Sequence, residues 1–362
     1  MTIRFEIPPL YCPLPPPRPH PDEALLEKRG LDHLEAWGLT ADPVDRVRAA
    51  HTRSHELMAR MTPDAPADPV QLSVDWAYMA FALDDRRTDS GPSSADTTAL
   101  CLWFSGLDYA GTTLDTTPLP EDVFYPAVAD LSARIRAATT PALWRRWLTE
   151  NKAMAWAALW ETSHRTSGRL AGFATFLTVR PDLGMGLGTL VCAEIAAGLR
   201  VPEDERNDPL VRAVTQAAGL LITLDNDLYS FPREDRAARL AGRDPLAEPT
   251  PIPILMREHR STVAEAALRL VLIRDRIMDR ALRLAERAAS RPYSDDTRAL
   301  LGIALAVVRD HLDWAPRAAR YTDPDGTHPD AIDLRWNGLT ATPPADDRPL
   351  PYPAVSWWWD VD

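Results

Sequence analysis

The sequence predicts an all-α protein folded as a single helical domain. From Asp22 onward it is dominated by alanine, leucine and arginine, which favour helix, and the period-two alternation that marks strands is scarce. No repeat of about 20–50 residues and no interdomain linker interrupts the 362 residues. Because 45% of the residues are hydrophobic, one large helical bundle can bury a sizeable core.

The N-terminal segment, residues 1–22, departs from the helical pattern. Its many prolines exclude a helix, because proline lacks the backbone N–H group that a helix interior requires. Apolar residues among them (Phe5, Ile7, Leu10 and Tyr11) favour an extended strap that packs across the domain, and a disordered arm is the alternative.

The helical domain is expected to span residues 23–321. Helices are predicted at 22–37, 44–61, 67–88, 94–110, 122–137, 141–165, 168–178, 185–199, 207–231, 251–259, 262–290 and 294–315. Pro232 should kink or end the helix that contains it. Residues 322–362 are rich in proline and aspartate and predict a loosely ordered tail. The role of its Trp357–Trp359 cluster is open, with docking on the domain or on a second subunit as the alternatives.

The net charge and the cysteine content limit the binding partners and the cellular compartment that we expect for the protein. The net charge of −12 argues against nucleic acid or an anionic membrane as the main partner. Three scattered cysteines (Cys12, Cys101 and Cys192) indicate a reducing cytoplasm without a disulfide framework. No apolar run approaches about 18 residues, so no membrane insertion is expected, and the N-terminus lacks the apolar core of a signal peptide.

Two polar clusters interrupt apolar helical runs. Asn226, Ser230 and Glu234 are spaced i, i+4, i+8, so on a helix they line one face, each turned roughly 40° from the last. An amide oxygen, a hydroxyl and a carboxylate in a row suit a hard cation such as Mg²⁺, although a solvated polar face is the alternative.

The second cluster lies earlier in the chain. Asp84, Asp85 and Asp89 follow an apolar helix, where like charges repel and oppose the helix dipole unless a cation neutralises them. Asp84 and Asp89 are about 140° apart on an ideal helix, so sharing metal ions requires the helix to end or loosen near Thr88.

Together the two clusters resemble the DDxxxD/E and N-D-x-x-S-x-x-x-E motifs of bacterial class I terpene synthases, also called terpene cyclases. The resemblance runs from about Phe5 to Tyr321. It implies a class I terpenoid synthase α-helical bundle with a deep apolar active-site cavity. It also implies three Mg²⁺ ions, two held by Asp84 and Asp89 and the third by the Asn226, Ser230 and Glu234 motif.

The resemblance implies further roles at matching positions. Arg180 corresponds to the family's diphosphate sensor and Gly184 to its effector residue, while Arg233, Arg320 and Tyr321 would bind the substrate diphosphate. Arginine suits this role because its planar fork can hold phosphate oxygens in pairs.

The linker position between sensor and effector departs from the family pattern. Leu183 occupies it, whereas relatives more often carry a polar residue there, and Asp182 would take the position if the register differed by one residue.

Aromatic residues are candidates for the cavity wall, where their faces can stabilise carbocations. Phe81 and Trp314 are the leading candidates for this catalytic role. Trp76, Trp156 and Trp160 also lie in apolar helical runs, where plain core packing is the alternative.

The resulting hypothesis is a Mg²⁺-dependent terpene cyclase. It ionises a linear isoprenyl diphosphate, with farnesyl diphosphate favoured, and cyclises the carbocation to a sesquiterpene with release of diphosphate. A diterpene synthase that uses geranylgeranyl diphosphate is the main alternative. A chain-elongating prenyltransferase would want two aspartate-rich motifs, and a non-catalytic helical binding protein would be expected to lose metal ligands. A homodimer is possible by family habit.

Overall fold

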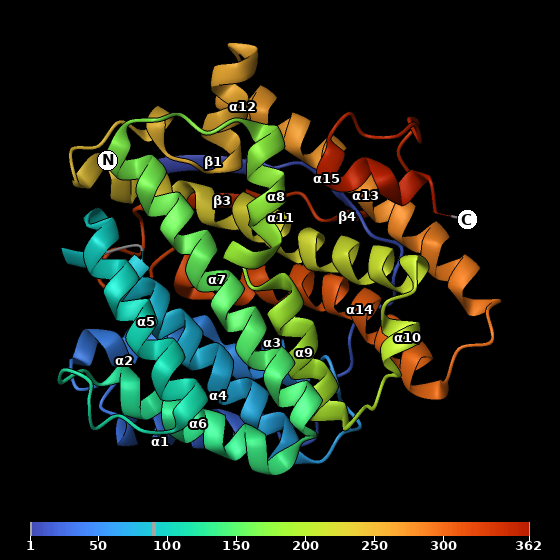
Figure 1. The fold of residues 1–362 in the computed structure, drawn as a ribbon. Coiled ribbons are helices and arrows are strands. Elements are labelled where there is room, and N and C mark those ends of the chain that lie inside the picture. Colours follow the sequence, from blue (N-terminus) through green and yellow to red (C-terminus); the bar gives the residue numbers. More distant parts are fainter. Residues whose placement is uncertain (1, 89–91, 362) are drawn as a thin grey trace.

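The computed structural model describes residues 2–88 and 92–361, which form a helical bundle with a few short strands (Figure 1). The first half contributes helices α1 (Glu23–Ala36), α2 (Pro43–Thr52), α3 (Ser54–Ala59), α4 (Ala67–Leu83), α5 (Thr97–Thr113), α6 (Phe124–Ala138) and α7 (Pro141–Ser167). The second half contributes α8 (Phe173–Leu183), α9 (Gly186–Ala197), α10 (Glu203–Arg206), α11 (Pro209–Leu240), α12 (Pro251–His259), α13 (Val263–Ala289), α14 (Asp295–Trp314) and α15 (Pro353–Ser356). The predicted all-α fold is confirmed.

Helix α11 runs through the middle of the bundle and packs on α8, α9, α13 and α14 (Figure 1). Its start is fixed by Asp208, whose side chain accepts a hydrogen bond from the Leu210 N–H, and by Pro209 in the first helical position. Gly219 and Gly186 allow α11 and α9 to touch, since a Cβ on Gly186 would lie 2.3 Å from the Gly219 carbonyl oxygen. This close contact holds α11, the helix that carries Asn226, Ser230 and Glu234, against α9.

Several helix boundaries differ from the predicted ones for local reasons. The helix expected at 44–61 is two helices, because Arg53 adopts a left-handed conformation with φ 49°. The helix expected at 168–178 begins at Phe173 and continues through Pro181 to Leu183. Likewise α11 does not end at Pro232 but extends to Leu240, so the prediction of an end there is wrong. Pro181 and Pro232 each remove one backbone hydrogen bond, and both helices continue past them.

Two short parallel strand pairs join the ends of the chain. Strand β1 (Ile3–Ile7) pairs with β3 (Ile332–Trp336), and β2 (Leu10–Tyr11) pairs with β4 (Leu339–Thr340). In β1 and β2 Phe5, Ile7, Leu10 and Tyr11 are all buried. The N-terminal segment is therefore extended and packed on the domain, as its apolar residues predict.

The C-terminal segment does not form the loosely ordered tail that its composition predicts. Besides β3 and β4, it forms α15 and a 3₁₀ turn at Trp357–Trp359. Trp358 is buried, and its carbonyl oxygen accepts a 2.8 Å hydrogen bond from the Nε of Arg280 on α13. Of the alternatives for the tryptophan cluster, the structure shows docking on the domain. None of the described helices is long and apolar enough to cross a membrane.

Candidate active site

A deep cavity opens among α3, α4, α7, α8, α11 and α14. Its inner wall is mainly apolar and includes Leu57, Met58, Trp76, Ala77, Phe176, Ile222 and Val307. Its mouth is polar and includes Asp84, Arg180, Asn226, Arg233, Glu234 and Arg320. The two predicted motifs and all three predicted arginines thus meet at one opening.

The acidic motif lies on a local change of helix type. Helix α4 ends at Leu83, and residues Asp84–Thr88 form a π-helical turn, which widens the helix and changes the direction of its side chains. The Thr88 hydroxyl donates a 2.7 Å hydrogen bond to Asp84. The loosening near Thr88 that metal sharing requires is therefore present. Asp89, the other predicted carboxylate ligand, lies outside the described residues.

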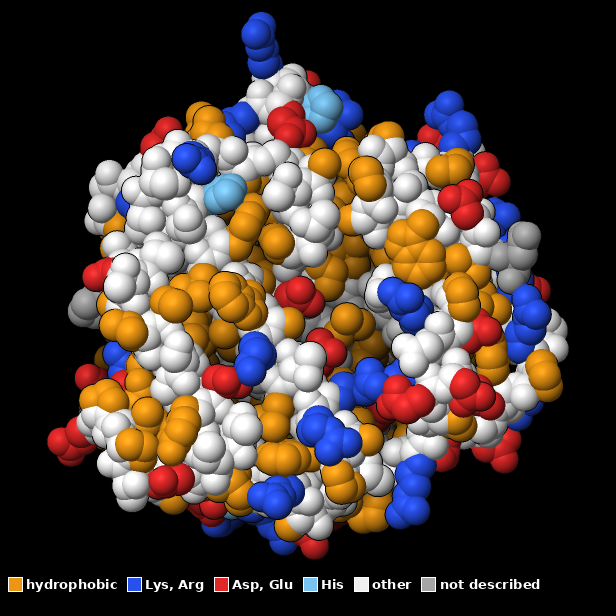
Figure 2. Space-filling model, viewed as in Figure 1, with side chains coloured by type: hydrophobic (Ala, Val, Ile, Leu, Met, Phe, Trp, Pro, Cys, Tyr) orange, Lys and Arg blue, Asp and Glu red, His pale blue; other side chains and the backbone are white. Residues whose placement is uncertain are grey.

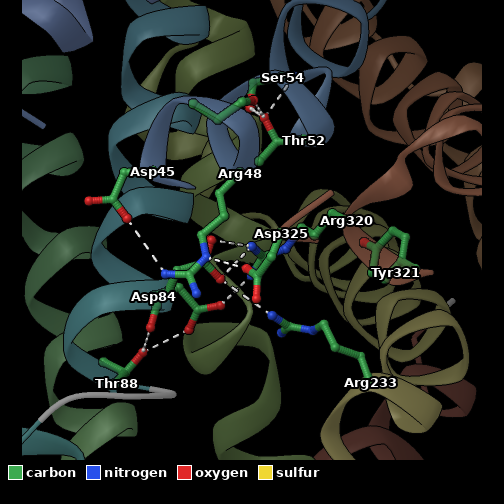
Figure 3. Close-up of polar contacts among 12 residues, drawn as sticks. Asp45, Arg48, Thr52, Ser54, Asp84, Thr88, Arg233, Arg320, Tyr321 and Asp325 are labelled. Carbon is green, nitrogen blue, oxygen red and sulfur yellow. Dashed lines mark hydrogen bonds and ion pairs between the residues drawn. The ribbon is translucent and has the colours of Figure 1, made fainter. Parts of the chain in front are cut away.

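Arginines converge on this turn (Figure 3). Arg320 holds both oxygens of Asp85 at 2.6 and 2.7 Å and contacts Asp84 at 2.7 Å. Arg233 reaches Asp85 at 3.3 Å. Burial alone would raise the pKa of the Asp85 carboxyl, but the guanidinium groups of Arg320 and Arg233 outweigh it and hold that pKa below its usual value. Asp85 is therefore the anchor that positions two diphosphate-binding candidates.

The second motif lies on one face of α11. Asn226 accepts a 3.1 Å hydrogen bond from Arg180 and donates a 2.8 Å hydrogen bond to the Tyr321 hydroxyl. Ser230 is buried, and its Oγ has no hydrogen-bond partner among the described residues. Glu234 lines the cavity mouth one turn further on.

Arg180 is fixed at the end of α8. The residue is 7% exposed, with Nε 3.0 Å from Asp227 and Nη2 3.0 Å from the Thr223 carbonyl oxygen. Burial raises the pKa of the Asp227 carboxyl, and Arg180 opposes that rise. A Cβ on Gly184 would lie 2.5 Å from Thr223 Cγ2, so only glycine fits at this helix break.

The residues that line the cavity bear on which residue, Leu183 or Asp182, takes the linker position between α8 and α9. Leu183, Gly184 and Met185 line the cavity, whereas Asp182 does not. This lining favours Leu183 over Asp182 for the linker position, and that assignment stays a prediction.

Stacked aromatic residues form one wall of the cavity. Phe81 and Trp314 stack with ring centroids 6.0 Å apart, and Tyr321 meets the Trp314 ring edge at 5.8 Å. The Trp314 Nε1 donates to the Thr52 carbonyl oxygen at 2.9 Å, which fixes the indole plane. Trp76 lines the same cavity, but Trp156 is 68% exposed and belongs neither to this wall nor to the core.

Some features of the site do not follow from the motifs. Asp227 is the aspartate of the N-D-x-x-S-x-x-x-E motif, but the spacing of that motif does not indicate its pairing with Arg180. His311 lines the cavity, its Nδ1 is buried without a hydrogen-bond partner among the described residues, and its ring packs 5.3 Å from Trp314. Because His311 precedes Trp314 by three residues on α14, helical spacing could have found it.

The oxygen set fits a hard cation. The buried Ser230 hydroxyl has no partner within the described part of the chain, and it lies between an amide oxygen and a carboxylate on the same helix face. Within residues 2–88 and 92–361, no group of three or more His, Cys, Asp or Glu side chains could hold a metal ion. The row on α11 is of a different kind, because two of its three oxygen donors are the Asn226 amide and the Ser230 hydroxyl.

The fold and the site define a class I terpenoid synthase, and comparison with known proteins agrees. Residues 75–280 match the family described as "Terpene synthase family 2, C-terminal metal binding". The chain belongs to this family, and the predicted family and enzyme class, a bacterial terpene synthase, are confirmed.

Similar proteins cover almost the whole chain. Phomopsene synthase of Allokutzneria albata is 30% identical over 99% of this chain and 100% of its own. A T-muurolol synthase of Streptomyces clavuligerus, described as farnesyl diphosphate cyclizing, is 27% identical over 97% of this chain and 81% of its own. The crystal structure of the SVS_A2 protein from ancestral sequence reconstruction is 27% identical, with a TM-score of 0.81 over 98% of both chains.

Proposed function

We propose that the protein is a Mg²⁺-dependent cyclase that ionises a linear isoprenyl diphosphate, with farnesyl diphosphate favoured, and releases a cyclic sesquiterpene and diphosphate. One observation carries the proposal. Oxygen-bearing side chains of both motifs and the three arginines line one cavity whose inner wall is apolar and aromatic; they are Asp84, Asn226 and Glu234, with Arg180, Arg233 and Arg320. That arrangement suits a substrate with a charged head group at the opening and a hydrocarbon chain inside.

Asp84 and Asp89 on one side, and Asn226, Ser230 and Glu234 on the other, are the proposed magnesium ligands, for three ions as the resemblance implies. Bound magnesium would supply the positive charge that stabilises the departing diphosphate. The family description names a metal-binding region, which supports a metal cofactor but does not identify the ion.

The arginines and Tyr321 complete the head-group site. Arg320 engages two carboxylates and Arg180 engages Asp227 and Asn226, so each has to give part of its contacts to phosphate oxygens when substrate binds. The guanidinium groups remain paired throughout, which avoids the cost of a buried unpaired charge. Exchange of partners at Asn226 would also release its oxygen from Arg180.

The apolar wall acts on the hydrocarbon. Once the C–O bond breaks and its electron pair leaves with diphosphate, Phe81 and Trp314 present ring faces to the allylic cation. The wall excludes water, which would otherwise capture the cation as an alcohol. The shape of the cavity then decides which carbons meet.

Purified protein with Mg²⁺ and either farnesyl or geranylgeranyl diphosphate, followed by gas chromatography with mass detection, tests the proposal. Asn226→Ala should abolish product formation, and Asn207→Ala, at an exposed helix end, is the matched control. A cyclic C15 product made by the wild type and by the control supports the proposal. Absence of product from folded wild-type protein with either substrate would refute it.

Chain length is the finer part of the proposal. Among the similar proteins, one name specifies farnesyl diphosphate and another is a diterpene cyclase of Streptomyces, which is 27% identical over 99% of this chain. Geranylgeranyl diphosphate therefore stays the alternative. Homodimerisation and a cytoplasmic location, the latter expected from three free cysteines, also stay predictions.

A further inference from the structure

A second cavity lies beside the first, between α4, α5 and α7. Its volume is about 280 Å³, against about 180 Å³ for the active-site cavity. Most of its wall is apolar and includes Met79, Phe104, Leu107, Leu148, Ala155 and Leu159. The metal motifs and the arginines of the mouth do not contribute to it, so this space needs a separate explanation.

The two cavities share a thin wall. Trp76, Met154 and Met185 line both of them, together with Ala80 and Leu83. We name the first three side chains the partition. Trp76 precedes Asp84 by eight residues on the same helical run, about 12 Å along the axis, so the Trp76 side of the partition lies away from the head-group site, whereas Leu83 is adjacent to Asp84.

The partition is built from side chains that can move. The Trp76 indole has one hydrogen bond, from Nε1 to Asn151 at 3.2 Å. A Cβ on Gly188 would lie 3.2 Å from Met185 Cε and 3.3 Å from Trp76 Cζ2, so the two side chains meet above this glycine. Methionine adapts to irregular spaces more readily than branched residues do.

Met185 also stands at a strained position. It directly follows Gly184 at the break between α8 and α9, and its backbone is left-handed, with φ 54°. A non-glycine residue in this region costs about 1 kcal/mol or more, and such residues cluster at functional sites. The left-handed backbone conformation places the flexible, apolar Met185 side chain between the two cavities.

We propose that the second cavity accepts the distal isoprene units of an isoprenyl diphosphate longer than farnesyl diphosphate, and that the partition sets the chain length. This inference rests on the proposed function. With the diphosphate held at the mouth, added carbons extend into the cavity, toward the Trp76 side of the partition. Displacement of Met154 and Met185 joins the two spaces along the direction in which the chain grows.

The outer side of the second cavity is closed by a polar pair and an exposed apolar rim. Lys152 on α7 and Asp108 on α5 are 3.0 Å apart. Hydrophobic side chains gather over α5 and α7 (Figure 2), with Leu102 70% and Trp156 68% exposed. A second copy of the chain seated on this rim is the competing occupant, and the experiment below separates the two.

Filling and opening the second cavity should move chain-length preference in opposite directions. Ala155 lines only the second cavity, so Ala155→Phe fills it, whereas Met154→Ala thins the partition. Ala153→Phe is the matched control, because Ala153 lies on the same helix and lines neither cavity. Folding of each variant is checked by thermal denaturation.

Each protein receives equimolar farnesyl and geranylgeranyl diphosphates with Mg²⁺, and the ratio of C20 to C15 products is measured. Met154→Ala should raise the ratio at least fivefold, and Ala155→Phe added to Met154→Ala should cancel that gain. Ala153→Phe should leave the ratio unchanged. A thermal shift with the non-ionisable thiolodiphosphate analogue of each length should show the same order for binding.

The outcomes separate this inference from the proposed function. Lack of any product from the folded wild-type protein and its variants refutes the proposed function. Products whose C20 to C15 ratio stays within twofold across the variants refute the second cavity as a chain site and leave the cyclase intact. Light scattering tests the competing occupant. If the wild type is a dimer, Ala155→Phe makes it a monomer and the product ratio does not change, then the second cavity and its rim bind a second copy of the chain, and the inference is overturned.

Discussion

Glu150 on α7 offers a direct test of the electrostatics around the helix break. Its partly buried carboxyl faces Asp182 on α8 and Glu194 on α9, and Arg146, one turn earlier, is its favourable charge. Burial, and then the nearby Asp182 carboxylate, raise the pKa of Glu150 to about 7 from the ordinary 4.5, and Arg146 opposes this rise. Substitution by glutamine keeps the shape and removes the charge.

The sign and the size follow from linkage. Between pH 4.5 and 7 the folded protein keeps a proton on Glu150 that the unfolded chain has released, so the free energy of unfolding falls as the pH rises. Each pKa unit corresponds to about 1.4 kcal/mol, which gives an upper value of about 3 kcal/mol. Because the side chain is partly exposed, we expect Glu150→Gln to be about 1–3 kcal/mol more stable than wild type at pH 8, and near wild type at pH 4.5.

Urea denaturation followed by circular dichroism at pH 5 and pH 8 measures this difference. Glu121→Gln, at an exposed carboxylate before α6, serves as the control for loss of one negative charge. The stability gain of Glu150→Gln should grow between the two pH values, whereas that of the control should not. A Glu150→Gln protein that gains nothing at pH 8 relative to pH 5 would refute the reasoning.

Further predictions concern the metal face, the buried ion pairs and the C-terminal segment. Ser230→Ala removes a buried hydroxyl without a partner among the described residues, so urea denaturation should show a change within about 1 kcal/mol, while product assays show at least a tenfold loss. Arg320→Met removes the main positive charge beside the buried Asp85 carboxylate, so it should lower the free energy of unfolding of the metal-free protein by about 3 kcal/mol. Arg335→Met, at an exposed strand position, is the control and should not have this effect. Trp358→Ala should cost about 3–5 kcal/mol by the same denaturation assay, yet leave turnover per folded molecule unchanged, because Trp358 does not line the active-site cavity.

Local spacing predicted the parts of the site that one helix determines. An α-helix fixes the relation of Asn226, Ser230 and Glu234 within a few turns, so their shared face could be derived without tertiary structure. The need for a looser turn near Thr88 followed in the same way from the angle between two aspartates. The turn takes the form of a π-helix from Asp84 to Thr88. That form depends on the tertiary contacts of the turn, so the sequence alone could not predict it.

Long-range partners could not be predicted from local pattern. Arg274 and Asp225 form a fully buried ion pair, with Nε 2.7 Å from Oδ1, and Arg274 also binds the Tyr11 carbonyl oxygen of the N-terminal segment. Helical periodicity would place a charged residue outward, because burial without a partner is costly. The partners lie 49 and 263 residues away, and no single-sequence pattern links them.

The pairing of β1 with β3 has a consequence for biosynthesis. Residues 3–7 leave the ribosome long before residues 332–336, which are their hydrogen-bond partners. At about 5–20 residues per second, the N-terminal strand waits on the order of tens of seconds for its mate. During that time the β1 side chains that are buried in the folded protein, and its unpaired backbone edge, are exposed to other chains or to chaperones. Strand β3 therefore completes a sheet that β1 begins, and a nascent chain halted before β3 would expose β1 as an unpaired strand that other chains could bind.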